Sequence, residues 1–351
     1  MADQLGKINF EGYQDLLAGR FGAARKEVKQ GPAFGVDVAI TSLPGGLAMA
    51  TTSDPLSLIP SLGLQESAWL SVHLMGNDMA TTGFAPQYGQ FVLNLPDTLS
   101  KADFNTYWSF IDRYCHEIGV AITGGHTGFV QGQNSTFAGG GTLITIAKES
   151  EMLCSTGAQE GDAILVTKSC ALTATAILGM SFPQTIKQKL GMGIYHSACE
   201  QFYQTSSLQD ALCAAGADKK YPEIHAMHDV TEGGVLGAIY EMLVASDKGG
   251  EIDIDQLPIG NVAAAISELF GLDPRYCVGA GSMVIACDGN KSEDVIKRLA
   301  EINILCTQVG RVTESIAGIQ SQKSGITSPL VYMETDPYWA AYFDALKAGW
   351  K

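Results

Sequence analysis

Four aspartates lie near glycine or proline at points where strands or helices are expected to end. They are Asp37 in Gly35-Val36-Asp37, Asp54 in Thr52-Ser53-Asp54-Pro55, Asp78 after Asn77, and Asp229 in His228-Asp229-Val230-Thr231. Loops at strand ends hold ligand-binding side chains in α/β proteins, because the sheet is rigid and these side chains need not pack. Carboxylates on separate loops are ligands that Mg²⁺ takes, usually together with the phosphates of a nucleotide. The four positions are what a magnesium–nucleotide site would require. Each also fits a structural role: a turn at Asp54, a helix-surface charge at Asp78 and a helix cap at Asp229.

Two glycine pairs offer backbone N–H groups that suit an anion. Gly124-Gly125 continues into His126-Thr127 directly after a predicted strand, and Gly233-Gly234 lies at the start of a predicted helix. Backbone N–H groups at such turns and helix N-termini bind phosphate. The alternatives are a tight connection at the first pair and close packing at the second. Neither pair belongs to a P-loop or to a dinucleotide-binding fingerprint.

Histidine and cysteine chemistry is poorly supported. His225 and His228 are three residues apart, but no third ligand follows at the spacing of a zinc site. The eight cysteines contain no C-x-x-C pair, which disfavours zinc and disulfide frameworks and favours a reducing, cytoplasmic compartment. Cys170, close to Lys168, is interpreted as a small buried residue rather than a reactive thiol.

Length and composition indicate a globular protein of two domains. The chain has 351 residues, of which 46% are hydrophobic and 17% are charged, so two packed cores are expected and disorder is not. The net charge of −15 argues against a nucleic-acid partner, which needs a basic face for the phosphates. The first residues do not resemble a signal peptide, and no apolar run reaches the length of a membrane span. The pattern restarts near residues 155–162, which predicts domains over 1–154 and 155–351.

Hydrophobic periodicity predicts a mixed α+β (α/β) chain. Ser100 and Asp103 form a capping-box-like start for an amphipathic helix with an apolar stripe through Phe104, Tyr107 and Ile111. The predicted helical regions cover residues 11–19, 66–82, 100–118, 193–214, 232–246 and 291–301. The predicted strands cover residues 36–41, 47–52, 91–95, 120–123, 142–147, 163–167, 251–254 and 282–286.

Segments along most of the chain resemble one family, in the same order. They are Gly31 to Ala39, Thr52-Ser53-Asp54, Gly76-Asn77-Asp78-Met79-Ala80 with Gly83-Phe84-Ala85-Pro86, Thr123-Gly124-Gly125-His126-Thr127, Gly161-Asp162 with Leu165-Val166-Thr167-Lys168, and His228 to Gly237. They are similar to the glycine–acid strand entry, the metal-binding "TD" and "ND-A…GA-P" segments, the GG-[DEH]-T loop, the "GD…ILVTK" opening and the "HD-T-GG-LG" helix start of the PurM-like (aminoimidazole ribonucleotide synthase-related) superfamily. The nearest resemblance is to HypE-like hydrogenase expression/formation proteins.

This resemblance implies a PurM-like two-domain fold, in which the N-terminal domain forms a β-barrel across a homodimer and a C-terminal α/β domain covers the nucleotide site. It implies ATP and Mg²⁺ as ligands, and an ATP-dependent phosphoryl transfer that activates an amide- or carboxylate-type small molecule. The implied metal ligands are Asp37, Asp54, Asp78 and Asp229, and the implied catalytic residues are Asp54, Asp78 and His126. The implied nucleotide-binding residues are Asp37, Asn77, Gly124, Gly125, Thr127, Lys168, Gly233 and Gly234.

Three features depart from the family pattern. His126 stands where several relatives have an acid, and a neutral imidazole is a poor Mg²⁺ ligand. Lys168-Ser169-Cys170 replaces a glycine-rich turn at the acceptor end of the site. The sequence ends Ala348-Gly349-Trp350-Lys351, without the cysteine through which HypE acts. Two alternatives to an enzyme are therefore a non-catalytic nucleotide-binding maturation or scaffold protein of the same fold, and a two-domain protein without a nucleotide site.

Overall fold

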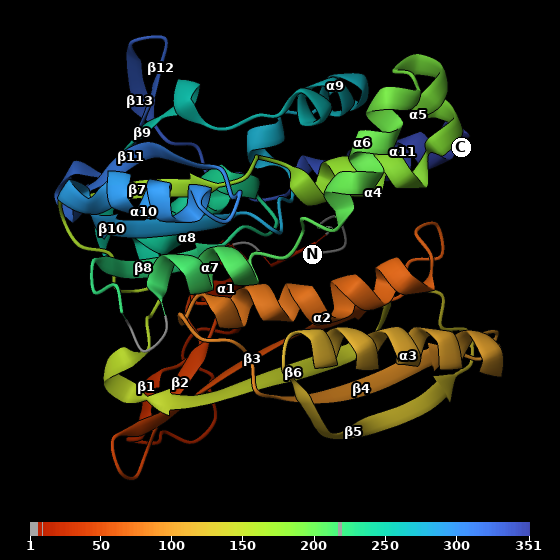
Figure 1. Ribbon diagram of the computed structural model, residues 1–351, viewed down its shortest axis with the longest axis horizontal. Helices are drawn as coiled ribbons and strands as arrows, with labels where there is room; N and C mark the ends of the chain where they lie inside the picture. Colours follow the sequence, from red (N-terminus) through yellow and green to blue (C-terminus); the bar gives the residue numbers. More distant parts are fainter. Residues whose placement is uncertain (1–5, 9, 217–219) are drawn as a thin grey trace.

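The computed structural model describes residues 6–8, 10–216 and 220–351, which form two β-sheets with helices packed around them (Figure 1). The first sheet has six strands in the order β1-β2-β3-β6-β4-β5. Its strands are β1 (Val28–Gln30), β2 (Ala39–Leu43), β3 (Leu47–Ser57), β4 (Tyr88–Pro96), β5 (Ala121–Val130) and β6 (Phe137–Lys148). Neighbouring strands are antiparallel except β4 and β5, which are parallel. The helices of this N-terminal half are α1 (Phe10–Leu16), α2 (Leu64–Ala80) and α3 (Lys101–Glu117).

The second sheet has seven strands in the order β13-β12-β9-β11-β7-β10-β8 and forms the C-terminal half. Its strands are β7 (Asp162–Thr167), β8 (Ile224–Asp229), β9 (Lys248–Asp253), β10 (Met283–Asp288), β11 (Cys306–Glu314), β12 (Ile319–Lys323) and β13 (Ile326–Pro329). The helices are α4 (Leu172–Ser181), α5 (Pro183–Lys189), α6 (Met192–Phe202), α7 (Leu208–Ala215), α8 (Gly234–Ala245), α9 (Asn261–Phe270), α10 (Ser292–Ala300) and α11 (Pro337–Lys347). The predicted mixture of helices and strands is therefore confirmed.

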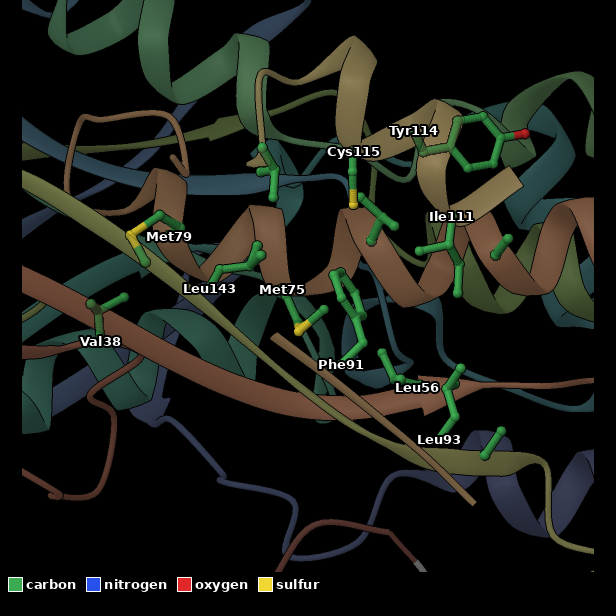
Figure 2. Packing of buried hydrophobic residues seen from close by; sticks show 14 of the residues in the cluster. Val38, Leu56, Met75, Met79, Phe91, Leu93, Ile111, Tyr114, Cys115 and Leu143 are labelled. Atoms are coloured by element: carbon green, nitrogen blue, oxygen red, sulfur yellow. The ribbon is translucent and has the colours of Figure 1, made fainter. Parts of the chain in front are cut away.

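The core of the N-terminal half lies between the first sheet and the helices α2 and α3 (Figure 2). Side chains of β4 alternate, so that Phe91 and Leu93 are buried while Val92 is exposed. Met75 of α2 and Ile111 of α3 pack against this buried face. Burying each of these large side chains stabilises the fold by about 1.5–3 kcal/mol, so the packing fixes α2 against the sheet.

The start of α3 confirms the predicted cap. The Ser100 hydroxyl accepts a hydrogen bond from the backbone N–H of Asp103 at 3.0 Å and donates one to the Asp103 carboxylate at 2.7 Å. These bonds satisfy one of the free N–H groups of the first turn and hold the helix start. From there Tyr107 and Ile111 follow on the buried face, as the apolar stripe predicts.

The bounds of several predicted elements differ from those observed, and in three of them contacts with distant residues override the local pattern. The strand predicted over 36–41 begins only at Ala39, so Asp37 lies in the loop before β2. The strand predicted over 120–123 continues to Val130, since β5 pairs with the whole length of β4. The helical region predicted over 193–214 consists of α6 and α7, separated by residues 203–207.

Helix α2 lies between the first sheet and the C-terminal half (Figure 1). The opposite face of the first sheet is turned away from α2 (Figure 1). Tyr88 and Val92 of β4 and Ile146 of β6 alternate with buried residues and are exposed, so they belong to this face. Residues at the C-terminal end of α2 and in the loop before β2 are thus placed next to the second half. Among the described residues, no helix combines the length and the apolar character that crossing a membrane requires.

Candidate metal and nucleotide site

Asp37, His228 and Asp229 meet in a buried cluster between the two halves. Asp37 comes from the loop before β2, and the other two residues end β8. The Nδ1 atom of His228 lies 3.3 Å from an oxygen of Asp37 and 3.9 Å from an oxygen of Asp229. One ligand atom from each of the three residues lies within 4.8 Å of the others. The fold therefore brings together two of the predicted aspartates that are far apart in the sequence.

Asp54 and Asp78 interact electrostatically with this cluster. Asp78 lies on α2, where its carboxylate accepts a hydrogen bond from the Thr52 hydroxyl of β3 at 2.6 Å. Burial raises the pKa of Asp78 well above its usual range, and the charges on Asp229, Asp54 and Asp37 raise it further. This coupling connects all four aspartates that the sequence singles out.

Burial is the main cause of the raised pKa values in the cluster. Together with the charge on Asp37, it raises the pKa of Asp229 to about 7. It raises the pKa of Asp54 to about 6, although the charge on Lys7 acts in the opposite direction. The charged form of each carboxylate is therefore disfavoured, and a cation placed among them would reverse this effect.

A fifth acid, Glu241 of α8, balances part of this charge. It lies 3.5 Å from Nε2 of His228 and 2.9 Å from Nζ of Lys7, and it accepts a hydrogen bond from the Tyr332 hydroxyl at 2.9 Å. Burial opposes the charge on His228, but Asp37 and Glu241 outweigh it and raise the pKa of His228 to about 9. Burial also opposes the charge on Glu241, but Lys7 and His228 lower the pKa of Glu241 to about 2. His228 is thus a buried cation held between acids.

Sequence reasoning missed Glu241, Lys7 and Tyr332. Glu241 is the single charged residue in the apolar sequence of α8, GVLGAIYEMLVA, and an isolated acid in such a helix is a usable signal. Lys7 has no comparable local signal, because its partner is 234 residues away. The contact exists only because the fold brings the N-terminal segment against α8.

The donor set of the cluster fits a hard divalent cation. Atom Oδ1 of Asp229 is buried, and no group within residues 6–8, 10–216 and 220–351 donates a hydrogen bond to it. Carboxylate oxygens are the ligands that Mg²⁺ prefers, and Asp37 offers one within 4.8 Å of Asp229. Charged His228 is no ligand in this state, since its ring nitrogens both carry protons. Of the four predicted metal ligands, Asp37 and Asp229 lie in this cluster, and Asp54 and Asp78 are coupled to it electrostatically.

Comparison with known proteins places this arrangement in a family. Residues 35–147 match the model of the AIR synthase related protein N-terminal domain, and residues 159–319 match that of the C-terminal domain. The chain belongs to the AIR synthase related family.

Individual relatives support the same assignment. The chain is 25% identical over 261 residues to carbamoyl dehydratase HypE of Azotobacter vinelandii, covering 73% of this chain and 71% of that protein. It is 26% identical over 302 residues to selenide, water dikinase of Methanococcus maripaludis, covering 82% and 86%. The solved structure of hydrogenase maturation protein HypE in complex with ATP has the same fold, with a TM-score of 0.67, 21% identity and coverage of 86% of this chain and 89% of that one.

In this AIR synthase related protein, two predicted nucleotide-binding side chains bind the protein itself. The amide of Asn77 donates to the carbonyl of Thr205 at 3.0 Å and accepts from the N–H of Ser207 at 2.7 Å. Asn77 is fully buried, so the geometry does not support a contact between this side chain and a phosphate. The ammonium of Lys168 forms an ion pair of 2.8 Å with Asp210. It also donates to three backbone carbonyls, those of Gln204, Ser206 and Gly281.

The glycine pair at the start of α8 is explained by close packing. The N–H of Gly233 donates to the Asp336 carboxylate at 3.0 Å, and that of Gly234 donates to the Thr231 carbonyl at 3.2 Å. A side chain at Gly234 would collide with the carbonyl of Arg275. Both predicted phosphate donors are therefore engaged, and the packing alternative describes this helix start.

The Gly124-Gly125-His126-Thr127 segment lies inside the edge strand β5 instead of in a turn. Asp54 pairs with Gly141 of β6, Gly141 with Phe91 of β4, and Phe91 with Gly125. The segment is thus three strands, or roughly 14 Å, from Asp54 within one chain. A side chain at Gly125 would collide with the Phe91 carbonyl, which explains the glycine. Within one chain, the fold does not bring His126 to the carboxylates.

Proposed function

We propose that this protein is an ATP-dependent enzyme that binds Mg²⁺–ATP at the aspartate cluster and transfers a phosphoryl group to an amide- or carboxylate-type small molecule. The observation that carries the proposal is the cluster of Asp37, His228 and Asp229, to which Asp54 and Asp78 are coupled electrostatically. One buried oxygen of Asp229 has no hydrogen-bond donor among the described residues. A relative solved with ATP and another named as a dikinase support the choice of ATP.

The residues of the cluster have distinct roles in this proposal. The aspartates would hold Mg²⁺, which would offset the negative charge on the transferred phosphoryl group. Asp37 and Asp229 would contribute their carboxylates from different halves of the chain. His228, kept charged by Asp37 and Glu241, holds the Asp37 carboxylate in place through the 3.3 Å contact.

The test replaces Asp54 or Asp78 by Asn and measures the melting temperature with Mg²⁺, with ATP and with both. A ligand that binds only the folded state raises the melting temperature, so the wild type should shift most with both ligands present. Asp54→Asn and Asp78→Asn should remove this shift and the Mg²⁺-dependent conversion of ATP to ADP. Asp97→Asn, at an exposed position after β4, is the matched control and should behave as the wild type. An undiminished shift in both variants would contradict the proposed site.

A non-catalytic nucleotide-binding protein of the same fold is the second candidate. The contacts of Lys168 with Asp210 and backbone carbonyls favour this candidate, because its ammonium then has no hydrogen left to bind a phosphoryl-acceptor substrate. Incubation of the protein with Mg²⁺–ATP and candidate amides distinguishes the two. Sustained formation of ADP supports the enzyme, whereas binding without turnover supports the scaffold.

We further propose a homodimer formed through the uncovered face of the first sheet, with domains over 1–154 and 155–351. Tyr88, Val92 and Ile146 give this face an apolar character, and the edge strand β5 carries exposed His126 and Thr127. A second copy packed on the face is the arrangement in which these two residues approach a nucleotide site.

A further inference from the structure

Residues 203–207, between α6 and α7, are held by one stripe of side chains on α2. We call these residues the bridge segment. Trp69 donates to the Thr205 hydroxyl at 3.0 Å, and His73 shares a hydrogen bond of 2.9 Å with the Ser206 hydroxyl. Asn77 binds the Thr205 carbonyl and the Ser207 N–H, as described above. The spacing of four residues places Trp69, His73 and Asn77 on the same side of the helix. Hydrogen bonds from three side chains of α2 therefore hold the bridge segment against the N-terminal half.

Lys168 holds the bridge segment from the C-terminal half. Its ammonium donates to the carbonyls of Gln204 at 3.2 Å, Ser206 at 2.7 Å and Gly281 at 2.8 Å, and it pairs with buried Asp210. Lys168 has a φ of 57°, a left-handed conformation that is strained for a residue with a side chain. A strained backbone conformation persists where surrounding contacts fix the residue. Here the four partners of the Lys168 ammonium hold the residue in place.

Each end of this connection reaches one of the clustered aspartates. Asn77 directly precedes Asp78 on α2. On the other side, Gly281 leads into β10, where Met283 pairs with Asp229. The N–H of Val230 also donates to the Ser282 carbonyl at 3.2 Å. A continuous series of contacts therefore runs from Asp78, through the bridge segment, to Asp229.

We propose that Asn77 and Lys168 are positioning residues, which set the distance between Asp78 and Asp229 through the bridge segment. This inference rests on the proposed function, since it concerns the same cation site. It assigns Asn77 a role different from direct phosphate binding, because both ends of its buried amide bind the backbone of the other half. Residues that hold metal ligands in place typically change metal affinity by 10- to 100-fold when they are replaced.

The experiment compares Asn77→Ala with Tyr107→Phe in the full chain. Tyr107→Phe is the matched control, because it removes buried hydrogen bonds of the Tyr107 hydroxyl to Ser57 and Ser71 in the N-terminal core. Mg²⁺–ATP affinity is measured by calorimetry well below the melting temperature. Amide hydrogen exchange of residues 203–207 and 282–284 is followed in the nucleotide-free protein.

We expect Asn77→Ala to weaken Mg²⁺–ATP binding by about 10- to 100-fold and to speed exchange in both segments. Tyr107→Phe should lower the melting temperature without either effect. The double variant Lys168→Met/Asp210→Asn, which removes both charges of the ion pair, should weaken binding similarly. Adding Asn77→Ala to it should have little further effect, because residues in one series of contacts are not additive.

Two results would overturn the positioning role. Faster exchange with unchanged Mg²⁺–ATP affinity in Asn77→Ala would leave Asn77 a purely structural residue. Lost binding in Asn77→Ala with normal binding in Lys168→Met/Asp210→Asn would make Asn77 a direct ligand. Failure of the proposed function has a different signature, since the wild type itself would then show no Mg²⁺–ATP binding, whatever the exchange data show.

Discussion

Replacing Asp229 by Asn should stabilise the metal-free protein, and the gain should depend on pH. Asp229 is almost fully buried, and burial with the charge on Asp37 raises its pKa to about 7 from an ordinary value of 3.8. The folded protein therefore keeps a proton that the unfolded chain has lost between these two values. For such an acid, the stability contribution is complete below the unfolded pKa and is lost as the pH rises through the folded pKa.

The expected magnitude follows from the size of this shift. A difference of one pKa unit corresponds to about 1.4 kcal/mol, so ionising Asp229 costs the folded protein about 4 kcal/mol between pH 4 and pH 8. Asparagine does not titrate and does not incur this cost. The neighbouring Asp37, Asp54 and Asp78 share part of the repulsion, so we expect Asp229→Asn to gain about 2–4 kcal/mol over the wild type at pH 8. Near pH 4 the gain should vanish.

The assay is urea unfolding of both proteins in EDTA at pH 4.5, 6.5 and 8. An unchanged denaturant slope in the variant shows that the extent of unfolding is the same. Addition of Mg²⁺ and ATP at pH 8 should then reverse the order, because only the wild type gains stability from the bound ligand. A pH-independent difference, or a variant that is less stable than the wild type in EDTA at pH 8, would refute the reasoning about buried charge.

Three further predictions concern the cap, the buried cation and the uncovered sheet face. Ser100→Ala should lower the free energy of unfolding by about 1 kcal/mol in urea, because the Asp103 N–H loses its acceptor; no change would contradict the cap. Glu241→Gln should lower the pKa of His228 from about 9, because one of the acids that keep the imidazole charged is removed; an NMR titration with an unchanged pKa would contradict that pairing. Val92→Asp should convert a dimer to monomers in light scattering, since it places a charge on the apolar face; a persisting dimer would place the interface elsewhere.

Elements with strong local patterns could be predicted from the sequence. The cap at Ser100 and the stripe through Tyr107 and Ile111 determine α3 without any distant contact. The alternation of β4 likewise decides which of its side chains face the core. By contrast, all six residues of β7 are buried, and β8 is buried along nearly its whole length, so their sequences carry no alternation to read. β7 was predicted from a short apolar run, whereas β8 was interpreted only as a histidine-containing segment.

Acids near glycine or proline at expected element ends are a local signal that singles out the four aspartates, and the family resemblance groups them as metal ligands. Their partners were not, since Lys7 and Glu241 meet only through the tertiary fold. The glycine segments misled for a related reason. At Gly125 and Gly234, a carbonyl of a neighbouring segment occupies the space that a side chain would need. The sequence does not show whether a glycine is required for such close packing or for anion binding.

The charges around His228 explain why the cluster suits a metal better than protons. Among the described residues, Asp37, Asp54, Asp78, Asp229 and Glu241 belong to one electrostatically coupled group, on which the cations Lys7 and His228 also act. Burial is the first cause that raises the pKa values of Asp54 and Asp229, and the charges of nearby carboxylates raise them further. Glu241 keeps its charge, because Lys7 and His228 contact it directly. Asp37 and Asp229 lie 3.3 and 3.9 Å from Nδ1 of His228, but burial still raises the pKa values of both acids. A divalent cation would therefore gain most beside these two carboxylates.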